Sequence, residues 1–195
     1  MNQQDVTEEL HHPGARDLLD SATLLRLGYN GSDGFPRVIP IGFHWDGNQI
    51  VICTAATAPK VEALSSRPEV ALTIDVGDTP TEAKALLMRG VATLDIADGV
   101  PDEYVAASRK ALDADQVAEF ERHARSIYDQ MARIRIQPQW ARLFDFGAGR
   151  MPRLLSAAPQ LRHLTCASPA TRPALDTTSM THPGPGLTDP SQRLS

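Results

Sequence analysis

Residues 37–54, which read RVIPIGFHWDGNQIVICT, have the pattern of a β-hairpin. Both halves are rich in the β-branched and aromatic residues that favour strands. Between them, Asp46-Gly47 is a strong signal for a hairpin turn. Pro40 has no amide hydrogen for a sheet ladder, so we expect it at a sheet edge, at a bulge or facing a ligand. This stretch therefore predicts a β-meander.

Further strands are expected on both sides of this hairpin. The segment before it is expected to begin as a short helix and to continue as a strand up to the turn formers of residues 30–34, and apolar β-type segments follow it at residues 70–76, 85–96, 134–136 and 140–146. The strands come in runs, whereas a doubly wound fold would alternate strands with helices. We predict a mainly β fold, a closed or split barrel of six to seven strands with a helical insertion.

Two segments have helical patterns. Residues 57–65 form a short candidate helix, with Thr57 as its N-cap and Pro59 in its first turn. Residues 101–131 place Tyr104, Val105 and later apolar residues at three- and four-residue spacing, which predicts a helical hairpin inserted between strands.

Composition divides the 195-residue chain into a body and two ends. Residues 1–14 are polar and are expected to form a flexible tail, whereas residues 15–155 carry the barrel domain. Residues 156–195 are rich in Pro, Ser and Thr without apolar periodicity, which is typical of a disordered tail.

Charge and hydropathy narrow the partners and the compartment. The net charge of −5 argues against a protein that binds the phosphate backbone of nucleic acid. No apolar run approaches the roughly 20 residues that span a bilayer, and the polar N-terminus does not have the pattern of a secretory signal. We expect a soluble, cytoplasmic protein whose cysteines are reduced.

The segment from Cys53 to Lys60 is the best candidate for a binding site. A strand end there runs into a helix start, which brings the Thr54 and Thr57 hydroxyls, free first-turn amides and Lys60 into seven residues. That combination is suited to a phosphate group. The simpler alternative is ordinary capping, with Thr57 satisfying the helix and Lys60 pointing to water.

Other site signals in the sequence are weak. Arg37 opens a strand and could pair with the same anion, although a cation at a strand start is more often solvated. The histidines lack metal-ligand spacing, and neither a nucleophile elbow nor a phosphate-loop motif is present. We therefore assign no catalytic side chain from the sequence.

An ordered set of short motifs resembles the pyridoxamine 5′-phosphate oxidase-like family of flavin-binding split barrels. The resemblance covers about residues 20–150. Within it, the helical insertion and the following residues 140–146 resemble the actinobacterial-type branch of that family. The motifs are Asp33-Gly34, residues 36–41, Asp46-Gly47, residues 50–54, Lys60, Leu64, Arg67-Pro68, residues 70–74, Arg89-Gly90 and Ala92.

The resemblance implies a homodimer with FMN or F420 bound at the interface. Position by position, it assigns side-chain and backbone contacts to Arg37, Val38, Ile39 and Pro40, strand-end contacts to Cys53 and Thr54, and the phosphate end to Ala58, Pro59 and Lys60. The C-terminal signature of the classical oxidase is not matched by Arg150-Met-Pro-Arg153, so vitamin B6 oxidation is not expected.

These observations lead to two functional hypotheses. The first is an oxidoreductase in which FMN or F420 transfers a hydride to a small conjugated substrate, while the protein supplies orientation and a dry pocket. The alternative is a flavin, haem or tetrapyrrole carrier without turnover. The colour of the purified protein, and whether its bound cofactor accepts a hydride, distinguish the two hypotheses.

Overall fold

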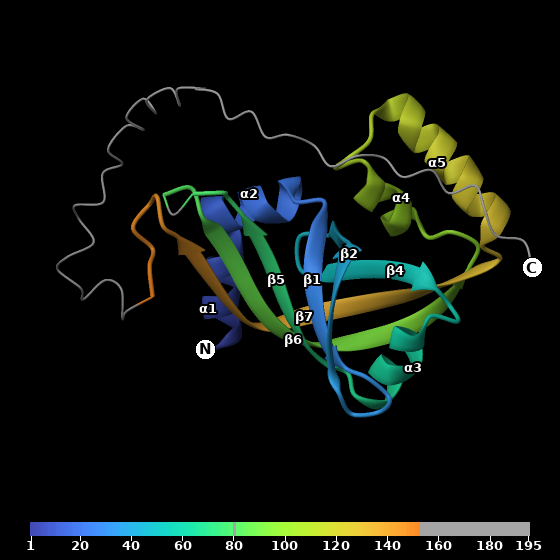
Figure 1. Ribbon diagram of the computed structural model, residues 1–195, viewed down its shortest axis with the longest axis horizontal. Helices are drawn as coiled ribbons and strands as arrows, with labels where there is room; N and C mark the ends of the chain where they lie inside the picture. Colours follow the sequence, from blue (N-terminus) through green and yellow to red (C-terminus); the bar gives the residue numbers. More distant parts are fainter. Residues whose placement is uncertain (80, 153–195) are drawn as a thin grey trace, which may run out of the picture. The chain divides into compact units, whose positions relative to one another are not determined.

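The computed structural model describes residues 1–79 and 81–152, and its centre is one antiparallel sheet of seven strands (Figure 1). The order across the sheet is β2-β1-β5-β6-β7-β4-β3. The strands are β1 (Leu24–Asn30), β2 (Pro36–Gly42), β3 (His44–Trp45), β4 (Ile50–Ala55), β5 (Glu69–Val76), β6 (Lys84–Asp98) and β7 (Gln130–Asp145). The architecture confirms the predicted mainly β fold with six to seven strands and a helical insertion.

The sheet curves around one apolar core. Alternate residues of β1 and β5, such as Leu25 and Leu72, are buried while their neighbours face outward. Each such side chain contributes about 1.5–3 kcal/mol of burial free energy. The core also takes Leu86, Met88, Ile50, Ile52, Ile134 and Ile136 from the other long strands.

The curvature brings the two ends of the sheet toward each other. β2 is the outermost strand at one end, and it comes close to β4 near the other end. Pro40 therefore lies on an edge strand, as expected, opposite Arg26 of β1. The hairpin turn between β3 and β4 contains Gly47 at φ +102°, a conformation that favours glycine.

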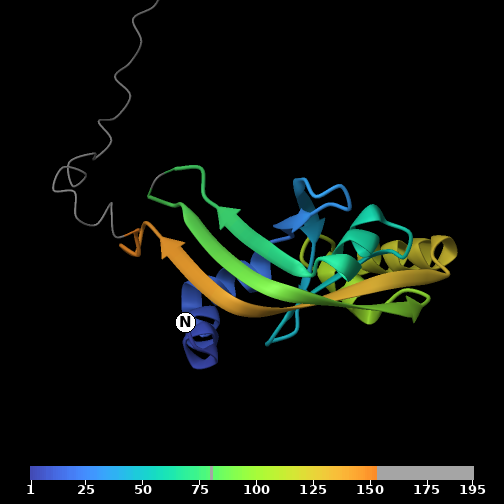
Figure 2. The same cartoon turned by 90° about the horizontal axis from the view of Figure 1, so that it is seen from below.

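β6 and β7 form the longest pair in the sheet (Figure 2). We predicted two short strands around Pro138, but the structure has one strand that continues through it. A β-bulge permits this: Arg89 pairs with Trp140 and Gly90 with Pro138, so Gln139 is extra. A Cβ on Gly90 would lie 2.5 Å from the Gln137 carbonyl oxygen, so glycine is needed there.

The prediction of a flexible tail over residues 1–14 is wrong. This segment forms α1 (Gln3–His11) and the start of α2 (Pro13–Ser21). Val6 and Leu10 lie one turn apart and are buried against the sheet, where α1 packs on β7. Glu9 binds the Leu143 amide and the Arg150 guanidinium at 2.6 and 2.5 Å. Two apolar side chains and one ion pair thus hold a largely polar helix.

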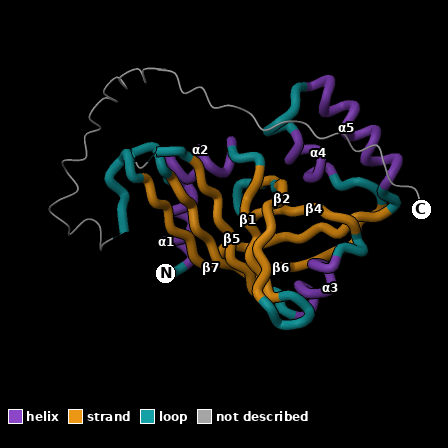
Figure 3. The backbone as a smooth tube through the Cα atoms, in the orientation of Figure 1, coloured by secondary structure: helices purple, strands orange, loops and turns teal. Residues whose placement is uncertain are grey.

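The remaining helices flank β4. α4 (Asp102–Ser108) and α5 (Ala114–Ile127) occupy the expected insertion and lie on one side of β4, whereas α3 (Pro59–Ser66) lies on the other (Figure 3). The insertion packs on Val51, Cys53 and Met131 as a second, smaller apolar cluster. No helix of the described residues is long and apolar enough to cross a bilayer. The predicted tail, residues 156–195, lies outside the described residues.

Candidate functional site

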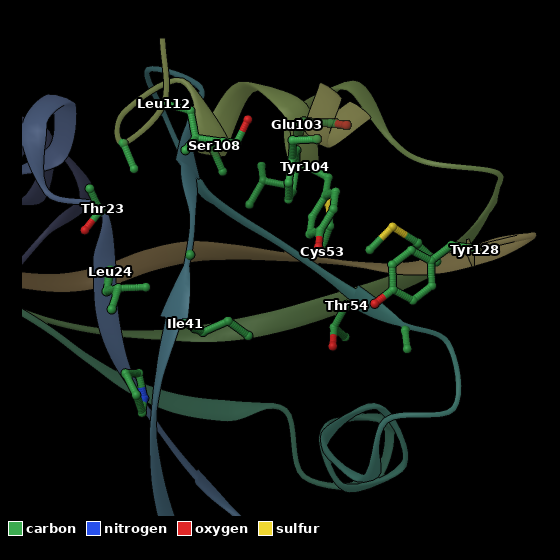
Figure 4. A pocket seen from close by; sticks show the side chains of 18 residues that line it. Thr23, Leu24, Ile41, Cys53, Thr54, Glu103, Tyr104, Ser108, Leu112 and Tyr128 are labelled. Atoms are coloured by element: carbon green, nitrogen blue, oxygen red, sulfur yellow. The ribbon is translucent and has the colours of Figure 1, made fainter. Parts of the chain in front are cut away.

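A cavity of about 800 Å³ opens where β2 approaches β4, and the α4–α5 insertion forms its roof (Figure 4). This volume is within the usual range for small-molecule sites. Thr23, just before β1, lines the cavity together with the strand residues Leu24, Pro40, Ile41, Gly42, Val51, Cys53, Thr54, Ala55 and Met131, and the insertion contributes Glu103, Tyr104, Ala107, Ser108, Ala111, Leu112, Phe120 and Tyr128.

Three aromatic rings form the wall beneath the insertion. Tyr104 lies between the other two, with its ring centroid 5.2 Å from that of Phe120 and 6.4 Å from that of Tyr128. Such offset and edge-on pairs are favourable geometries. Burial, reinforced by the neighbouring Tyr128, raises the pKa of Tyr104. Its hydroxyl therefore stays protonated near neutral pH and can donate a hydrogen bond.

The strand end and helix start meet beside this cavity. Lys60 Nζ donates to Thr54 Oγ1 at 3.2 Å, and Thr54 itself lines the cavity. Burial lowers the pKa of the half-buried Lys60. A carboxylate or phosphate at this position would restore the interaction that the desolvated ammonium lacks. The structure thus places a cation and a hydroxyl together at the predicted strand end.

The start of α3 differs from the prediction in one respect. Ala58 is the N-cap and makes no side-chain capping bond, so the proposed capping role of Thr57 is wrong. Pro59 takes the first helical position, which suits its missing amide and fixed φ. No side chain caps the helix, Pro59 has no amide hydrogen, and the Val61 amide donates to the Ala58 carbonyl at 2.8 Å, so the Lys60 amide is the first-turn donor left for another acceptor.

Residues 37–40 divide into two groups. Pro40 lines the cavity with Cys53 and Thr54, whereas Arg37, Val38 and Ile39 are not among its lining residues. The Arg37 guanidinium pairs with Asp33 at 2.8 Å. The Phe35 amide, followed by the Arg37 charge, lowers the pKa of Asp33. Val38 is 68% exposed on the outer face of β2.

Cys53 is a buried thiol on the cavity floor. Desolvation, followed by the nearby Glu103 carboxylate, raises its pKa to about 12. The reactive thiolate is therefore scarce at neutral pH. Cys53 contributes an apolar surface to the cavity and is poorly suited to act as a nucleophile.

A charge network fixes α4 to the sheet. Glu103, at the cavity margin, pairs with Arg133 of β7 at 3.4 Å, and Arg133 lies 3.7 Å from Asp95 of β6. Asp95 also forms an ion pair with Arg135. These four groups carry two charges of each sign, so the network as a whole is neutral and holds the roof in place.

The sequence did not single out the aromatic wall. Tyr104 and Phe120 were interpreted as ordinary helix-packing residues because they follow the apolar period of the insertion. An amphipathic signal was present, since Tyr104 and Tyr128 each combine an apolar ring with a polar hydroxyl. Their shared cavity arises from tertiary packing on β4, which the local spacing does not reveal.

Comparisons with known proteins agree with this architecture. The solved structure of the conserved hypothetical protein Rv2991 of Mycobacterium tuberculosis is 19% identical, with a TM-score of 0.55 over 78% of this chain and 89% of that one. HutZ, the haem storage protein of Vibrio cholerae, is 17% identical, with a TM-score of 0.50 over 69% of this chain and 93% of that one. At these identities the similarity establishes the fold alone.

Sequence comparison defines the family. A search of curated proteins finds no match to this chain. The sequence profile described as pyridoxamine 5′-phosphate oxidase, in contrast, matches residues 12–145, which include all seven strands. This chain therefore belongs to the pyridoxamine 5′-phosphate oxidase family.

Proposed function

We propose that the chain is an oxidoreductase that binds FMN or F420 and acts on a small conjugated substrate. The observation that supports it best is the Lys60–Thr54 contact at the edge of a large, aromatic-walled cavity. Family membership adds the expectation of a flavin-type cofactor.

The residues present fit the phosphate of such a cofactor. Lys60 supplies a cation and Thr54 a hydroxyl, and the uncapped start of α3 supplies the Lys60 amide beside them. Charge-assisted bonds of this kind are among the stronger ones in proteins. Ala58 and Pro59 would present backbone instead of bulky side chains to the phosphate, which allows a close approach.

The ring system would extend from this phosphate end along the β2 and β4 edges. Pro40 has no amide to leave unsatisfied, and Cys53 remains a neutral thiol there. The resemblance also assigns contacts to Arg37, Val38 and Ile39. In this chain they would meet the cofactor outside the cavity, and Arg37 would have to exchange its Asp33 partner or share it.

When bound, FMN or F420 supplies hydride transfer, and the protein's own part is to bind, orient and exclude water. Tyr104 and Tyr128 provide two of the hydroxyl groups in a mostly apolar roof. A protonated Tyr104 can donate a hydrogen bond to a carbonyl oxygen of a substrate ring held beneath it, and this bond would orient the substrate.

The proposal includes a homodimer. Val38 is 68% and Phe35 73% exposed, and both belong to the β1–β2 edge of the sheet. Exposed apolar side chains gathered on a strand surface are a common feature of subunit interfaces. A second copy on this face would bring the contacts assigned to Arg37, Val38 and Ile39 to the cofactor between subunits.

Hydride acceptance tests the proposal. The protein is loaded with FMN and mixed anaerobically with NADPH, or loaded with reduced F420, and a quinone acceptor is then added. Bleaching of FMN followed by recovery, or recovery of F420 absorbance, faster than with free cofactor supports an oxidoreductase. Binding without any acceleration would favour the carrier, and failure to bind either cofactor would overturn the proposed oxidoreductase.

A further inference from the structure

The cavity beneath α4 and α5 has an unusual distribution of charge for a site next to the proposed phosphate site. Among its lining residues, all of them described, none is a lysine, arginine or histidine. The charged residue among them is Glu103, at the margin, and its carboxylate is paired with Arg133. The interior is otherwise apolar, with the hydroxyl groups of Thr23, Ser108 and the two tyrosines.

Two lysines adjoin lining residues of the cavity, but their ammonium groups have other partners. Lys60 is held by Thr54, whose hydroxyl lies on the side of β4 away from the insertion (Figure 4). Lys110 Nζ donates to the carbonyls of Leu19 and Ala22 at 2.7 and 3.2 Å. An anionic group inside the cavity would therefore lose water without gaining a cation, which is costly in an apolar surrounding.

The wall of the cavity favours a flat ring. Figure 4 shows the Tyr104 side chain reaching down from α4 toward β4, close to Tyr128. A planar ligand between this wall and Ile41 of β2 would bury both of its faces. Aromatic pairs contribute roughly 0.5–1.5 kcal/mol beyond simple burial, which is about two- to tenfold in affinity.

We propose that this cavity selects planar aromatic ligands without negative charge, and that Tyr104 is the residue that contacts their ring. The inference rests on the proposed function in that the ligand would be the substrate of the same site. It names the substrate class: an uncharged conjugated ring, and not a phosphate or carboxylate ester of one.

Three ligands of matched size test the selectivity: naphthalene-2-methanol, 2-naphthoate and naphthalene-2-methylamine. Their dissociation constants are measured by calorimetry on protein saturated with whichever cofactor it binds, or on the protein as purified. We expect the neutral alcohol to bind roughly tenfold more tightly than the anionic naphthoate, with the cationic amine no weaker than the naphthoate. Equal binding, tighter binding of naphthoate, or no binding of any of the three would overturn the proposal.

Substitutions test which residues produce this ligand selectivity. Tyr104→Ala should weaken binding of the alcohol by about two- to tenfold. Tyr104→Phe retains the ring, so its affinity for the alcohol should stay within about twofold of wild type. Arg109→Ala, at the C-cap of the same helix and outside the cavity, is the matched control. Ala111→Lys adds a cation at an exposed lining position and should improve naphthoate binding by about tenfold. If Ala111→Lys does not reduce the ratio of the naphthoate and alcohol dissociation constants, the charge argument is contradicted even if Tyr104→Ala does not fold.

The outcome for ligand selectivity can be distinguished from the outcome for cofactor binding. If the protein binds FMN or F420 but shows no preference among the naphthalenes, the selectivity is wrong and the cofactor assignment stands. If the preference is present but neither cofactor binds, the cavity stands as a ligand site and the proposed oxidoreductase fails.

Discussion

Lys110 Nζ lies 3.5 Å from the centre of the Phe43 ring while it donates to the carbonyls at the end of α2. This one side chain joins the insertion to the N-terminal helices and to the linker between β2 and β3. Cations are favourable at a helix C-terminus and over an aromatic face. The roof of the cavity is therefore anchored to the barrel at two places, here and at the Glu103–Arg133 ion pair.

The Lys110 contact predicts a pH dependence of stability. Burial, only partly offset by Asp20, lowers the pKa of Lys110 to about 8. The unfolded chain, with a pKa near 10.5, then binds more protons than the folded chain between these values, so the contribution of Lys110 to the free energy of unfolding rises with pH across that window. Urea unfolding of wild type and Lys110→Met at pH 7.5 and 10, values chosen on either side of roughly pH 8, should show this rise in wild type alone. Parallel pH profiles would count against it.

Glu9 predicts a dependence at acid pH. Burial raises its pKa, but the hydrogen bonds from Leu143 and Arg150 together lower it below 4.5. Its stabilisation is therefore present above pH 4.5 and lost as the pH falls through the lowered value. At neutral pH, Glu9→Gln should cost about 1–3 kcal/mol in chemical unfolding. The control Glu8→Gln, at the exposed neighbouring position, should leave the free energy of unfolding nearly unchanged. Equal losses in the two variants would show that α1 is not anchored through Glu9.

The Cys53 thiol should resist modification. Because burial raises its pKa to about 12, a Cys166→Ser variant should react with a disulfide reagent far more slowly when folded than in guanidinium. Mass spectrometry over a time course at roughly pH 8 checks this. Reaction at the rate of a free thiol in the folded protein would mean that Cys53 is accessible.

Val38 tests the homodimer. A charge placed in a buried subunit contact is strongly unfavourable, so Val38→Glu should raise the dimer dissociation constant by at least about tenfold. Ile127→Glu, which charges an exposed position on α5, is the control. Sedimentation over a dilution series, with and without cofactor, gives the constants, and cofactor should tighten the dimer. A wild-type monomer at micromolar concentration that binds cofactor fully would refute the interface.

Much of the sheet could be predicted because its signals are local. The Asp46-Gly47 turn and the alternation in β1 and β5 depend on neighbouring residues alone. α1 was missed because its composition is polar and its anchoring depends on two buried side chains, Val6 and Leu10, and on the bond from the Leu143 amide to Glu9, 134 positions apart in the sequence. Its capping box, Asn2 with Asp5, was a readable helix-start signal.

The same distinction holds for the site. Thr54 and Lys60 are close in sequence, so their contact could be expected from a strand end that enters a helix. The continuous β7 could not, because it depends on a bulge that allows Pro138 to pair with Gly90 on another strand. The aromatic wall likewise forms only when α4 folds onto β4, far away in the sequence.

A paired binding measurement tests whether Thr54 and Lys60 form a phosphate site. FMN is compared with riboflavin, and F420 with its phosphate-free deazaflavin core, by equilibrium dialysis against wild type, Lys60→Ala and the control Arg125→Ala on α5. Wild type and the control should bind at least one phosphorylated cofactor about ten- to a hundredfold more tightly than its phosphate-free form, and Lys60→Ala should lose that difference. Equal binding of both forms by wild type, or an undiminished preference in Lys60→Ala, would contradict the assignment of Thr54 and Lys60 as the phosphate site.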